Sequence, residues 1–413
     1  MADTGQTAGR STVEWTGEVL ELDVDTVAHG GHCVARHTGR VVFVRHALPG
    51  ERVRARVTED RGGSFCRADA VEVLRAAPGR VSPACPLSGP DGCGGCDWQH
   101  ASAGTQRELK AQVVAEQLRR LAGLDWQVRV EPLPLDGPDE LLGWRSRVRL
   151  GVDERGRVGL RKSRGHELIP ITDCPISSPG MLAEVVDRQW TPGAEVVVTK
   201  DGAGEVHAAE VCGDNRGRTR QREVLGDPVA VEHVAGRRWS VRAHGFWQVH
   251  PSAAARLAEV VADWANARTG GRVWDLYAGA GLFTAVLADQ VGPGGSVLAV
   301  ESAPSAAADC RHNLAELPQV RVRTGRVERV VTGQRGSPEV VVLDPPRSGA
   351  GKAVVDAIAS RKPSTVVYVA CDPAALARDV ARFGLRGYRL AGLRAFDAFP
   401  MTHHVECVAL LTR

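Results

Sequence analysis

From about residue 240 to the end of the chain, short apolar runs alternate with stretches that carry apolar residues at helical spacing. The apolar runs predict buried parallel strands at Val273–Tyr277, Val297–Val300, Val340–Leu343 and Thr365–Ala370. The stretches between them predict helices at Leu282–Gln290, Ser305–Leu317, Lys352–Ser360 and Ala374–Phe383. This alternation predicts a doubly wound, Rossmann-like α/β sheet, in which ligands bind at the carboxyl ends of the strands. Two last runs, Tyr388–Phe396 and Val405–Leu411, are expected to pair as a hairpin.

The preceding part of the chain has a different pattern. Residues 13–76 contain short strands broken by glycine, proline and aspartate, which is typical of a small β-barrel. The strands are expected at Thr16–Leu22, Val41–Arg45, Val53–Thr58 and Cys66–Val73. Residues 78–238 form an irregular α+β region, with a helix expected at Thr105–Ala122 and a polar loop at Asp214–Arg222. The predicted domains are therefore 13–76, 78–238 and 240–413, because 413 residues are too many for one small core.

Composition narrows the class of protein without naming a function. The chain has 43% hydrophobic and 24% charged residues, as folded globular proteins do, and its net charge of +3 is too small to indicate nucleic-acid binding by itself. No apolar run is long enough to span a bilayer, and the polar residues 1–10 lack the pattern of a signal peptide. Ten cysteines in such a chain indicate thiol or metal chemistry in a reducing compartment. We expect a cytoplasmic monomer without a membrane partner.

An acidic, glycine-containing loop follows the first predicted strand of the sheet. The segment 275–281 has the sequence DLYAGAG, and its glycines allow a ligand to approach the backbone closely. A nicotinamide site would need a third glycine where Thr284 stands, and Asp275 favours a cationic or amine-bearing ligand over a phosphate. Glu301 stands at the end of the next strand, where a carboxylate can accept hydrogen bonds from both ribose hydroxyls. Asp344 stands at a further strand end, before two prolines that stiffen the loop. An unspecialised sheet with turn glycines is the alternative for the loop alone.

Cys371 follows the strand 365–370 and precedes Asp372-Pro373 at a predicted helix start. A helix N-terminus lowers the pKa of a thiol, whereas free cysteines are most often small buried residues, and position alone leaves both interpretations open. A thiolate that adds to carbon 6 of a pyrimidine makes carbon 5 able to accept a methyl group from a sulfonium. The carbon 5 proton must then leave, and Glu406 is the candidate base, with a charged surface residue as the alternative.

The chain also carries a pattern of metal-binding type. Cys85, Cys93 and Cys96 form C-x7-C-x2-C, and Cys174 is the natural fourth ligand. Four thiolates suit a [4Fe-4S] cluster or zinc, and the long first spacing departs from the usual zinc arrangements. The glycines around Cys93 would let backbone amides point at cluster sulfurs. The other cysteines outside the catalytic candidate are predicted to be packing residues: Cys33, Cys66, Cys212, Cys310 and Cys407.

Together these motifs resemble the RNA (uracil-5-)-methyltransferases, most closely the iron–sulfur-containing 23S ribosomal RNA branch. The N-terminal region resembles a TRAM domain, a small RNA-binding barrel, through Ala28-His29-Gly30-Gly31 and the segment 41–51. The segments that resemble cofactor and catalytic motifs are 246–249, 371–373, 377–379, 399–400 and 404–406. Cys33, His250 and Leu282 depart from the residues that are usual in the family.

The resemblance implies a cofactor, a cluster and two catalytic roles. S-adenosylmethionine (SAM) would contact Gln248, Tyr277, Glu301 and Asp344. A [4Fe-4S] cluster would be held by Cys85, Cys93, Cys96 and Cys174. Cys371 would be the nucleophile, and Glu406 would be the proton acceptor.

Basic residues interleaved with apolar ones suggest how RNA could be contacted. In Arg145–Arg149 and Arg155–Arg164, one strand face could pack while the other reaches phosphates, although a solvated charged face is the alternative. A uracil inside folded RNA must be flipped out, and Phe246 or Trp247 could stack in its place, with a position in the core as the equal alternative for Trp247.

The leading hypothesis is SAM-dependent methylation of carbon 5 of a uridine in RNA, with ribosomal RNA as the expected substrate and tRNA as an alternative. Methylation of carbon 5 of cytosine needs the same thiolate. A cluster-bearing RNA-binding assembly factor is the non-enzyme alternative, and the intact Cys371 and Glu406 argue against it.

Overall fold

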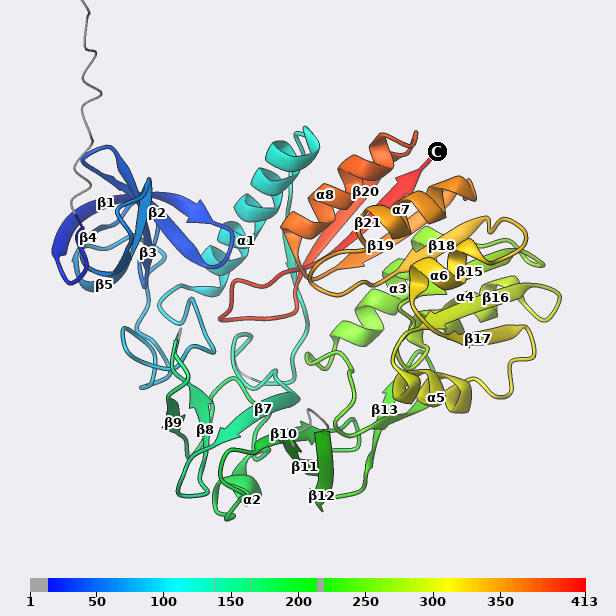
Figure 1. Cartoon of the computed structure of the whole chain (residues 1–413), viewed down its shortest axis with the longest axis horizontal. Coiled ribbons are helices and arrows are strands. Elements are labelled where there is room, and N and C mark those ends of the chain that lie inside the picture. The colour runs from blue at the N-terminus through cyan, green and yellow to red at the C-terminus, as the bar shows by residue number, and fades with distance from the viewer. Residues whose placement is uncertain (1–13, 138, 164, 214–218) are drawn as a thin grey trace, which may run out of the picture.

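The computed structural model describes residues 14–137, 139–163, 165–213 and 219–413. The polar start of the chain and the first part of the loop predicted at 214–222 lie outside these ranges. Figure 1 shows a β-barrel beside helix α1 (Ala103–Gln117), an eight-stranded sheet on the far side of that helix, and a six-stranded sheet beneath both. Among the residues described, no helix combines the length and apolarity that crossing a membrane requires.

The predicted N-terminal barrel is confirmed. Its five strands close in the order β1-β2-β3-β5-β4. They are β1 (Val19–Ala28), β2 (His32–His37), β3 (Arg40–Arg45), β4 (Arg52–Asp60) and β5 (Phe65–Arg75). Alternate residues point inward, as Leu20, Leu22 and Val24 do on β1, so the apolar positions fill the barrel interior. Strand β2 was not predicted, because its inward residues include the small Cys33 and Ala35 between histidines and arginine.

The region after the barrel contributes to two sheets. The predicted helix is confirmed as α1, which Ser102 caps, followed by one turn of π-helix at Leu118–Ala122. Short strand β6 (Val130–Pro132) then joins the edge of the eight-stranded sheet beside β20 (Arg389–Asp397). The separate six-stranded antiparallel sheet has the order β12-β11-β10-β7-β8-β9. Its elements are β7 (Arg147–Val152), β8 (Val158–Arg161), β9 (Leu168–Pro170), β10 (Glu195–Lys200), β11 (Val206–Gly213) and β12 (Thr219–Leu225), with helix α2 (Ala183–Val186) beside them.

One loop prediction is wrong in its described part. Residues 219–222 are not a loop but the first half of β12, which pairs antiparallel with β11. The polar side chains of residues 220–222 are compatible with a strand because β12 lies at the sheet edge and exposes them.

The doubly wound sheet predicted for the C-terminal part is confirmed, with strand order β17-β16-β15-β18-β19-β21-β20-β6. Its parallel strands are β15 (Arg272–Leu276), β16 (Ser296–Glu301), β17 (Val320–Thr324), β18 (Val340–Leu343) and β19 (Thr365–Ala370). The helices and the preceding hairpin are β13 (Val229–Val234), β14 (Arg237–Arg242), α3 (Ala253–Ala265), α4 (Leu282–Val291), α5 (Pro304–Asn313), α6 (Val327–Thr332), α7 (Gly351–Ser360) and α8 (Pro373–Gly384). Strand β21 (Glu406–Thr412) pairs antiparallel with both β19 and β20, so the predicted hairpin is also confirmed.

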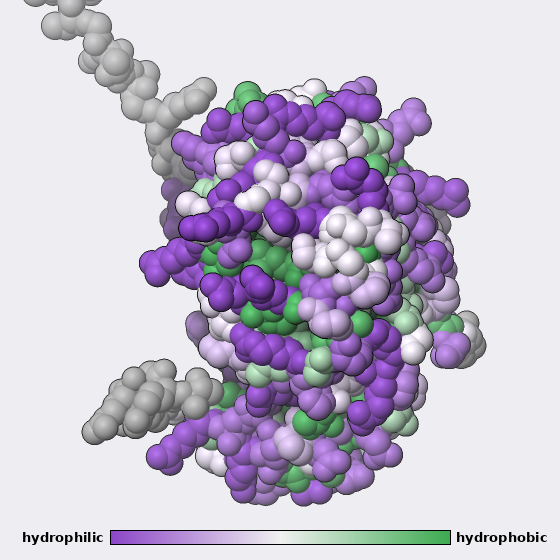
Figure 2. All heavy atoms as spheres, turned by 90° about the vertical axis from the view of Figure 1, so that its right-hand side faces the viewer, coloured by the Kyte–Doolittle hydropathy of each residue, from purple (hydrophilic) through white to green (hydrophobic). Residues whose placement is uncertain are grey.

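Two apolar layers hold the eight-stranded sheet. Helices α3, α4 and α5 cover one face, whereas α1, α6, α7 and α8 cover the other. Alternate residues of each strand enter opposite layers, as Val273 and Trp274 of β15 do, which explains why these strands are apolar on both faces. The face shown in Figure 2 is mostly hydrophilic, with a band of hydrophobic side chains set between polar ones.

Topology brings distant segments to one edge of this sheet. The parallel strands β15, β16, β18 and β19 all end there. Because β21 runs in the opposite direction, it begins at the same edge, with Ala370 of β19 opposite Cys407. The residue after β19 and the first residue of β21 therefore become neighbours.

Candidate active site

A cavity of about 630 Å³ lies at this edge of the sheet. That volume is within the range of small-molecule and cofactor sites. Its walls come from the ends of the parallel strands, the start of β21 and the segment 245–248. All six residues that the sequence singled out for cofactor binding and catalysis line it: Gln248, Tyr277, Glu301, Asp344, Cys371 and Glu406.

Cys371 lies in the turn between β19 and α8. The Asp372 carboxylate caps the helix by accepting a hydrogen bond from the backbone N–H of Ala375 at 2.7 Å. The expectation that the helix start lowers the pKa of the Cys371 thiol is wrong for the protein alone. Burial raises this pKa to about 12, and the neighbouring carboxyl groups of Glu406 and Asp344 act in the same direction. A counter-charge in the cavity is therefore needed to favour the thiolate.

A buried carboxyl group, that of Glu406, and a partly buried one, that of Asp344, face the same space. Burial, followed by repulsion from Asp344, raises the pKa of Glu406 well above its usual range. Burial and repulsion from Asp275 raise the pKa of Asp344 to about 7. Carboxyl groups in such surroundings favour a cation beside them, since a positive charge stabilises their ionised form. The electrostatics of the cavity therefore suit a positively charged ligand.

Two other acidic residues, Asp275 and Glu301, hold the glycine-containing loop between β15 and α4. The Asp275 carboxylate accepts a hydrogen bond from the hydroxyl of Thr284 at 2.5 Å, so the threonine at the third-glycine position supports the loop. Glu301 accepts hydrogen bonds from the backbone N–H groups of Gly279 at 3.0 Å and Ala303 at 2.7 Å. These contacts hold the Glu301 side chain at the cavity wall, where a carboxylate has further lone pairs for a ligand.

The segment between β14 and α3 closes another wall. Trp247 is buried against Trp239, with ring centroids 5.8 Å apart, so the alternative that it belongs to the core is confirmed. Phe246 is 70% exposed and lines the cavity, which leaves it as the stacking candidate of the pair. His250 is buried and stacks on Trp144.

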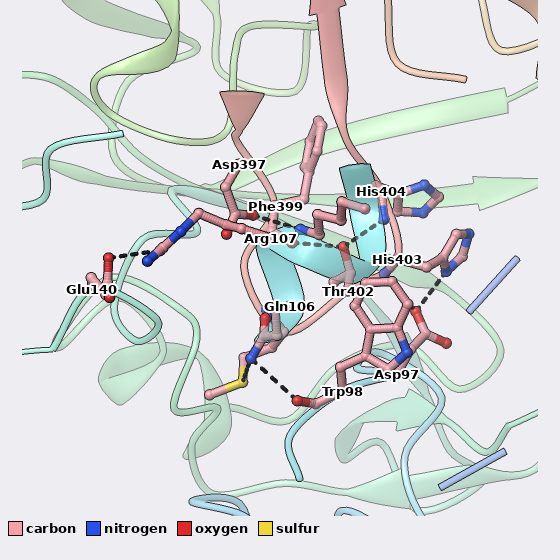
Figure 3. A network of polar contacts seen from close by, with 12 residues as sticks. Asp97, Trp98, Gln106, Arg107, Glu140, Asp397, Phe399, Thr402, His403 and His404 are labelled. Carbon is pink, nitrogen blue, oxygen red and sulfur yellow. Dashed lines mark hydrogen bonds and ion pairs between the residues drawn. The ribbon is translucent and has the colours of Figure 1, made fainter. Parts of the chain in front are cut away.

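Sequence reasoning missed the contacts that hold the loop before Glu406 (Figure 3). Asp97 accepts hydrogen bonds from the backbone N–H of His403 at 3.0 Å and from its Nδ1 at 2.6 Å. The fully buried Lys110 of α1 donates to Asp397 at 2.5 Å and to the carbonyl of Phe399 at 3.0 Å. These partners are about 290 to 306 positions apart in sequence, so no local pattern could reveal them.

Further contacts complete the support of this loop. Gln106 accepts from the backbone N–H of Met401 at 2.7 Å, and the backbone N–H groups of Asp97 and Trp98 donate to the carbonyl of Met401. His404, to which the sequence assigned no role, lies 3.3 Å from Arg347 of the cavity wall. The segment that follows the predicted metal-binding cysteines is therefore attached directly to the loop that carries Glu406.

The four predicted metal-binding cysteines line one cavity, although they come from two separate segments. The backbone N–H of Gly95 donates to the sulfur of Cys93 at 3.3 Å, and Gln99 donates to the sulfur of Cys96 at 3.4 Å. Within the described residues, no three His, Cys, Asp or Glu side chains are grouped closely enough to hold a metal ion. Of the predicted packing cysteines, Cys33, Cys66, Cys310 and Cys407 are buried, and Cys212 is partly buried.

The basic segment Arg145–Arg149 does not form the RNA-facing strand that its pattern suggested. Arg147 is buried and pairs with Glu232 at 3.1 Å, while it also donates to the backbone carbonyls before Phe246. Arg149 is exposed but pairs with Glu195 at 2.7 Å. Arg147 therefore supports the cavity wall instead of contacting a phosphate.

The comparisons with known proteins agree with this geometry. Residues 215–413 match the family model described as tRNA (Uracil-5-)-methyltransferase, and residues 14–71 match the TRAM domain. An uncharacterized RNA methyltransferase of Streptomyces avermitilis is 46% identical, over 96% of this chain and 98% of its own. Another, from Corynebacterium glutamicum, is 37% identical over 96% of this chain and 97% of its own.

A solved structure shares the fold over nearly the whole chain. The crystal structure of Pyrococcus abyssi tRNA (uracil-54, C5)-methyltransferase in complex with S-adenosyl-L-homocysteine has a TM-score of 0.71 at 21% identity, covering 95% of this chain and 100% of the other. The chain belongs to the family of RNA methyltransferases that these relatives represent, with a tRNA (Uracil-5-)-methyltransferase domain matched over residues 215–413 and a TRAM domain at its N-terminal end.

Proposed function

We propose that this protein transfers a methyl group from SAM to carbon 5 of a uridine in RNA, with Cys371 as the nucleophile and Glu406 as the proton acceptor. The observation that carries the proposal is that both side chains line one cavity with Gln248, Tyr277 and the carboxyl groups of Glu301 and Asp344. A thiol, a base and a cofactor-sized space are the parts that this reaction needs.

The cavity suits SAM in shape and charge. Glu301 stands at the end of β16, where a carboxylate can accept from ribose hydroxyls. The carboxyl groups of Asp344 and Glu406 favour a cation, and SAM carries a sulfonium charge. When bound, SAM supplies an electrophilic methyl group. Its positive charge would also lower the pKa of the Cys371 thiol.

The residues of this chain account for the remaining chemistry. The Cys371 thiolate forms a bond to carbon 6 of uracil, and the electrons of the 5,6 double bond move toward the carbonyl at carbon 4. Carbon 5 then accepts the methyl group. Glu406 removes the proton from carbon 5, the 5,6 double bond forms again, and the bond between carbon 6 and Cys371 breaks. Free thiolate and 5-methyluridine result.

The experiment that tests the two roles uses RNA with 5-fluorouridine at the target position. Fluorine cannot leave as a cation, so wild-type protein should form a stable adduct of protein and RNA. Cys371→Ser should form none, whereas Cys407→Ser, which alters a buried neighbour across the β19–β21 pair, should still form it. An adduct of unchanged yield in Cys371→Ser would exclude this nucleophile.

Glu406 is tested with ordinary RNA. Glu406→Gln keeps the size of the side chain but removes the base, so the adduct should form and then persist. Denaturing gels would measure the accumulated adduct, and labelled SAM would measure its turnover. Turnover at the wild-type rate would assign proton removal to another group.

We propose ribosomal RNA as the substrate class, because the barrel and the cysteine segment together resemble the 23S ribosomal RNA branch. Quantifying 5-methyluridine in separated ribosomal RNA and tRNA, with and without the gene, tests the assignment. Loss from tRNA alone would assign the enzyme to tRNA, and a loss of 5-methylcytidine would identify cytosine as the target base.

We also propose that Cys85, Cys93, Cys96 and Cys174 hold a [4Fe-4S] cluster. In such a cluster each thiolate binds a different iron, so the thiols surround a cavity and need not converge on one ion. Their position around one cavity fits that arrangement, and hydrogen bonds to Cys93 and Cys96 are the kind that tune cluster sulfurs. Anaerobically purified protein should contain iron and sulfide. A colourless, active protein that contains stoichiometric zinc would contradict the cluster and indicate a zinc site instead.

A further inference from the structure

One loop of the barrel reaches into the catalytic part of the molecule. The residues between β1 and β2 place His29 against Asp372, with His29 Nε2 donating to the carboxylate at 3.0 Å. Asp372 directly follows Cys371, and the two partners are 343 positions apart in sequence. The contact therefore joins the barrel to the turn that carries the nucleophile.

The Asp372 carboxylate has two tasks in this turn. One oxygen accepts from the backbone N–H of Ala375 and caps helix α8, while the other accepts from His29. Burial raises the pKa of Asp372, but hydrogen bonds from His29 and Ala375 outweigh it, and the pKa lies below its usual range. The side chain is thus an ionised acceptor held from both sides, on the residue that directly follows Cys371.

The same barrel loop also contacts the segment before Glu406. Gly31 has a φ of +80°, and a Cβ at this position would lie 3.0 Å from the Cβ of His403 and from the carboxyl carbon of Asp97. Its carbonyl accepts a hydrogen bond from the indole of Trp98 at 3.3 Å. Two residues of this barrel loop thus contact the catalytic part: His29 contacts the nucleophile turn, and Gly31 lies against the loop that leads to the base.

We propose that His29 is a positioning residue for the reaction: it holds Asp372 and so fixes the turn that presents Cys371, which makes the barrel part of the catalytic framework. A barrel that only bound RNA would need no specific contact with the nucleophile turn. The inference rests on the proposed function, because it assigns a role in presenting that nucleophile.

The test compares four full-length proteins. His29→Ala removes the contact, His29→Phe keeps a ring without a donor, and His29→Gln restores an amide donor. His37→Ala is the matched control, since His37 is another partly exposed histidine of the barrel and packs edge-on against Trp15 of the same region. His29 is itself partly exposed, so its replacement leaves the barrel interior filled.

Single-turnover adduct formation at saturating RNA measures the presentation of Cys371. His29→Ala and His29→Phe should slow it by about tenfold to a hundredfold, the loss expected when a reacting group is displaced. His29→Gln should recover much of the rate, and His37→Ala should match the wild type. The dissociation constant for RNA should remain within about twofold in all four variants. Weaker RNA binding by His29→Ala with an unchanged rate would overturn the proposal and make His29 an RNA contact.

Hydrogen exchange without RNA gives a readout that does not depend on methylation. The backbone amide of Ala375 and its neighbours at the start of α8 should exchange faster in His29→Ala and His29→Phe, and at the wild-type rate in His37→Ala. Unchanged exchange in His29→Ala would overturn the proposal. If wild-type protein formed no adduct with any RNA, the proposed function would fail, whereas faster exchange would still show that the barrel fixes this turn.

Discussion

Replacing Lys110 by methionine tests how the loop before Glu406 is held. Lys110 is completely buried in α1, and its ammonium group lies 2.5 Å from the carboxylate of Asp397 and 3.0 Å from the carbonyl of Phe399. Methionine fills a similar volume without the charge. The carboxylate of Asp397, at the end of β20, then stays buried without its cation.

The expected magnitude follows from this burial. Removing one partner of a buried ion pair costs about 3–5 kcal/mol, because the other charge remains without compensation. The lost hydrogen bond to the Phe399 carbonyl adds about 1 kcal/mol. Lys110→Met/Asp397→Asn removes both charges, so most of the loss should be recovered. The single variant should therefore be much less stable than the double variant.

The measurement combines urea denaturation with hydrogen exchange, because a chain with several cores need not unfold in one step. Exchange should increase in α1 and in residues 397–406. Arg107→Met is the matched control, since Arg107 lies on the same helix and pairs at 2.9 Å with the exposed Glu140. Solvent-exposed ion pairs contribute about 0–1 kcal/mol to the free energy of unfolding. If Lys110→Met lowered the free energy of unfolding no more than Arg107→Met does, the reasoning would be refuted.

Two further predictions concern the acidic cavity. The pKa of Asp344 is raised to about 7, so its carboxyl group contributes stability below its unfolded pKa, and this contribution is lost as pH rises through about 7. Asp344→Asn should therefore have a higher Tm than wild type at pH 8, and this difference in Tm should vanish near the ordinary carboxyl pKa. The variant should also lose methyl transfer. Equal Tm values of variant and wild type at pH 8 would contradict the stability prediction. Because the pKa values of Cys371 and Glu406 are both raised, single-turnover methylation should accelerate as pH rises through neutrality, and a flat pH profile would contradict their roles.

The sequence predicted those elements in which the pattern of apolar residues along the chain agrees with the residues that are buried in the structure. The strands at β15, β16, β18 and β19 were placed within about one residue, because both faces of each strand are buried and the apolar runs have clear ends. Edge strand β17 was missed, since its residues alternate between partly and fully exposed and include two arginines. Strand β6 was missed because three residues carry too little pattern and its partner, β20, lies far along the chain.

The residues of the candidate site fall into the same two groups, those that a local sequence pattern predicts and those that it does not. Glu301, Asp344 and Cys371 could be proposed from the sequence because each stands at the end of a predicted strand, and topology then brings the strand ends together. The contacts of Asp97 with His403 and of His29 with Asp372 could not, since they depend on how separate cores are docked. The basic segment around Arg147 was misinterpreted because an arginine that is buried in an ion pair has the same local pattern as one that faces solvent.

The pKa of Cys371 shows why a local rule is insufficient at this site. The rule that a helix start favours a thiolate considers only the turn at Asp372, where the α8 dipole is worth at most about 2 kcal/mol. Burial and the Glu406 and Asp344 carboxyl groups act more strongly in the opposite direction. The ionised forms of all three groups are disfavoured by burial and by neighbouring carboxyl groups, so one positive charge in the cavity would lower all three pKa values together. In the proposed reaction, a cationic methyl donor would therefore prepare the nucleophile and the base in the same binding step, and its neutral product would withdraw that support once the methyl group has been transferred.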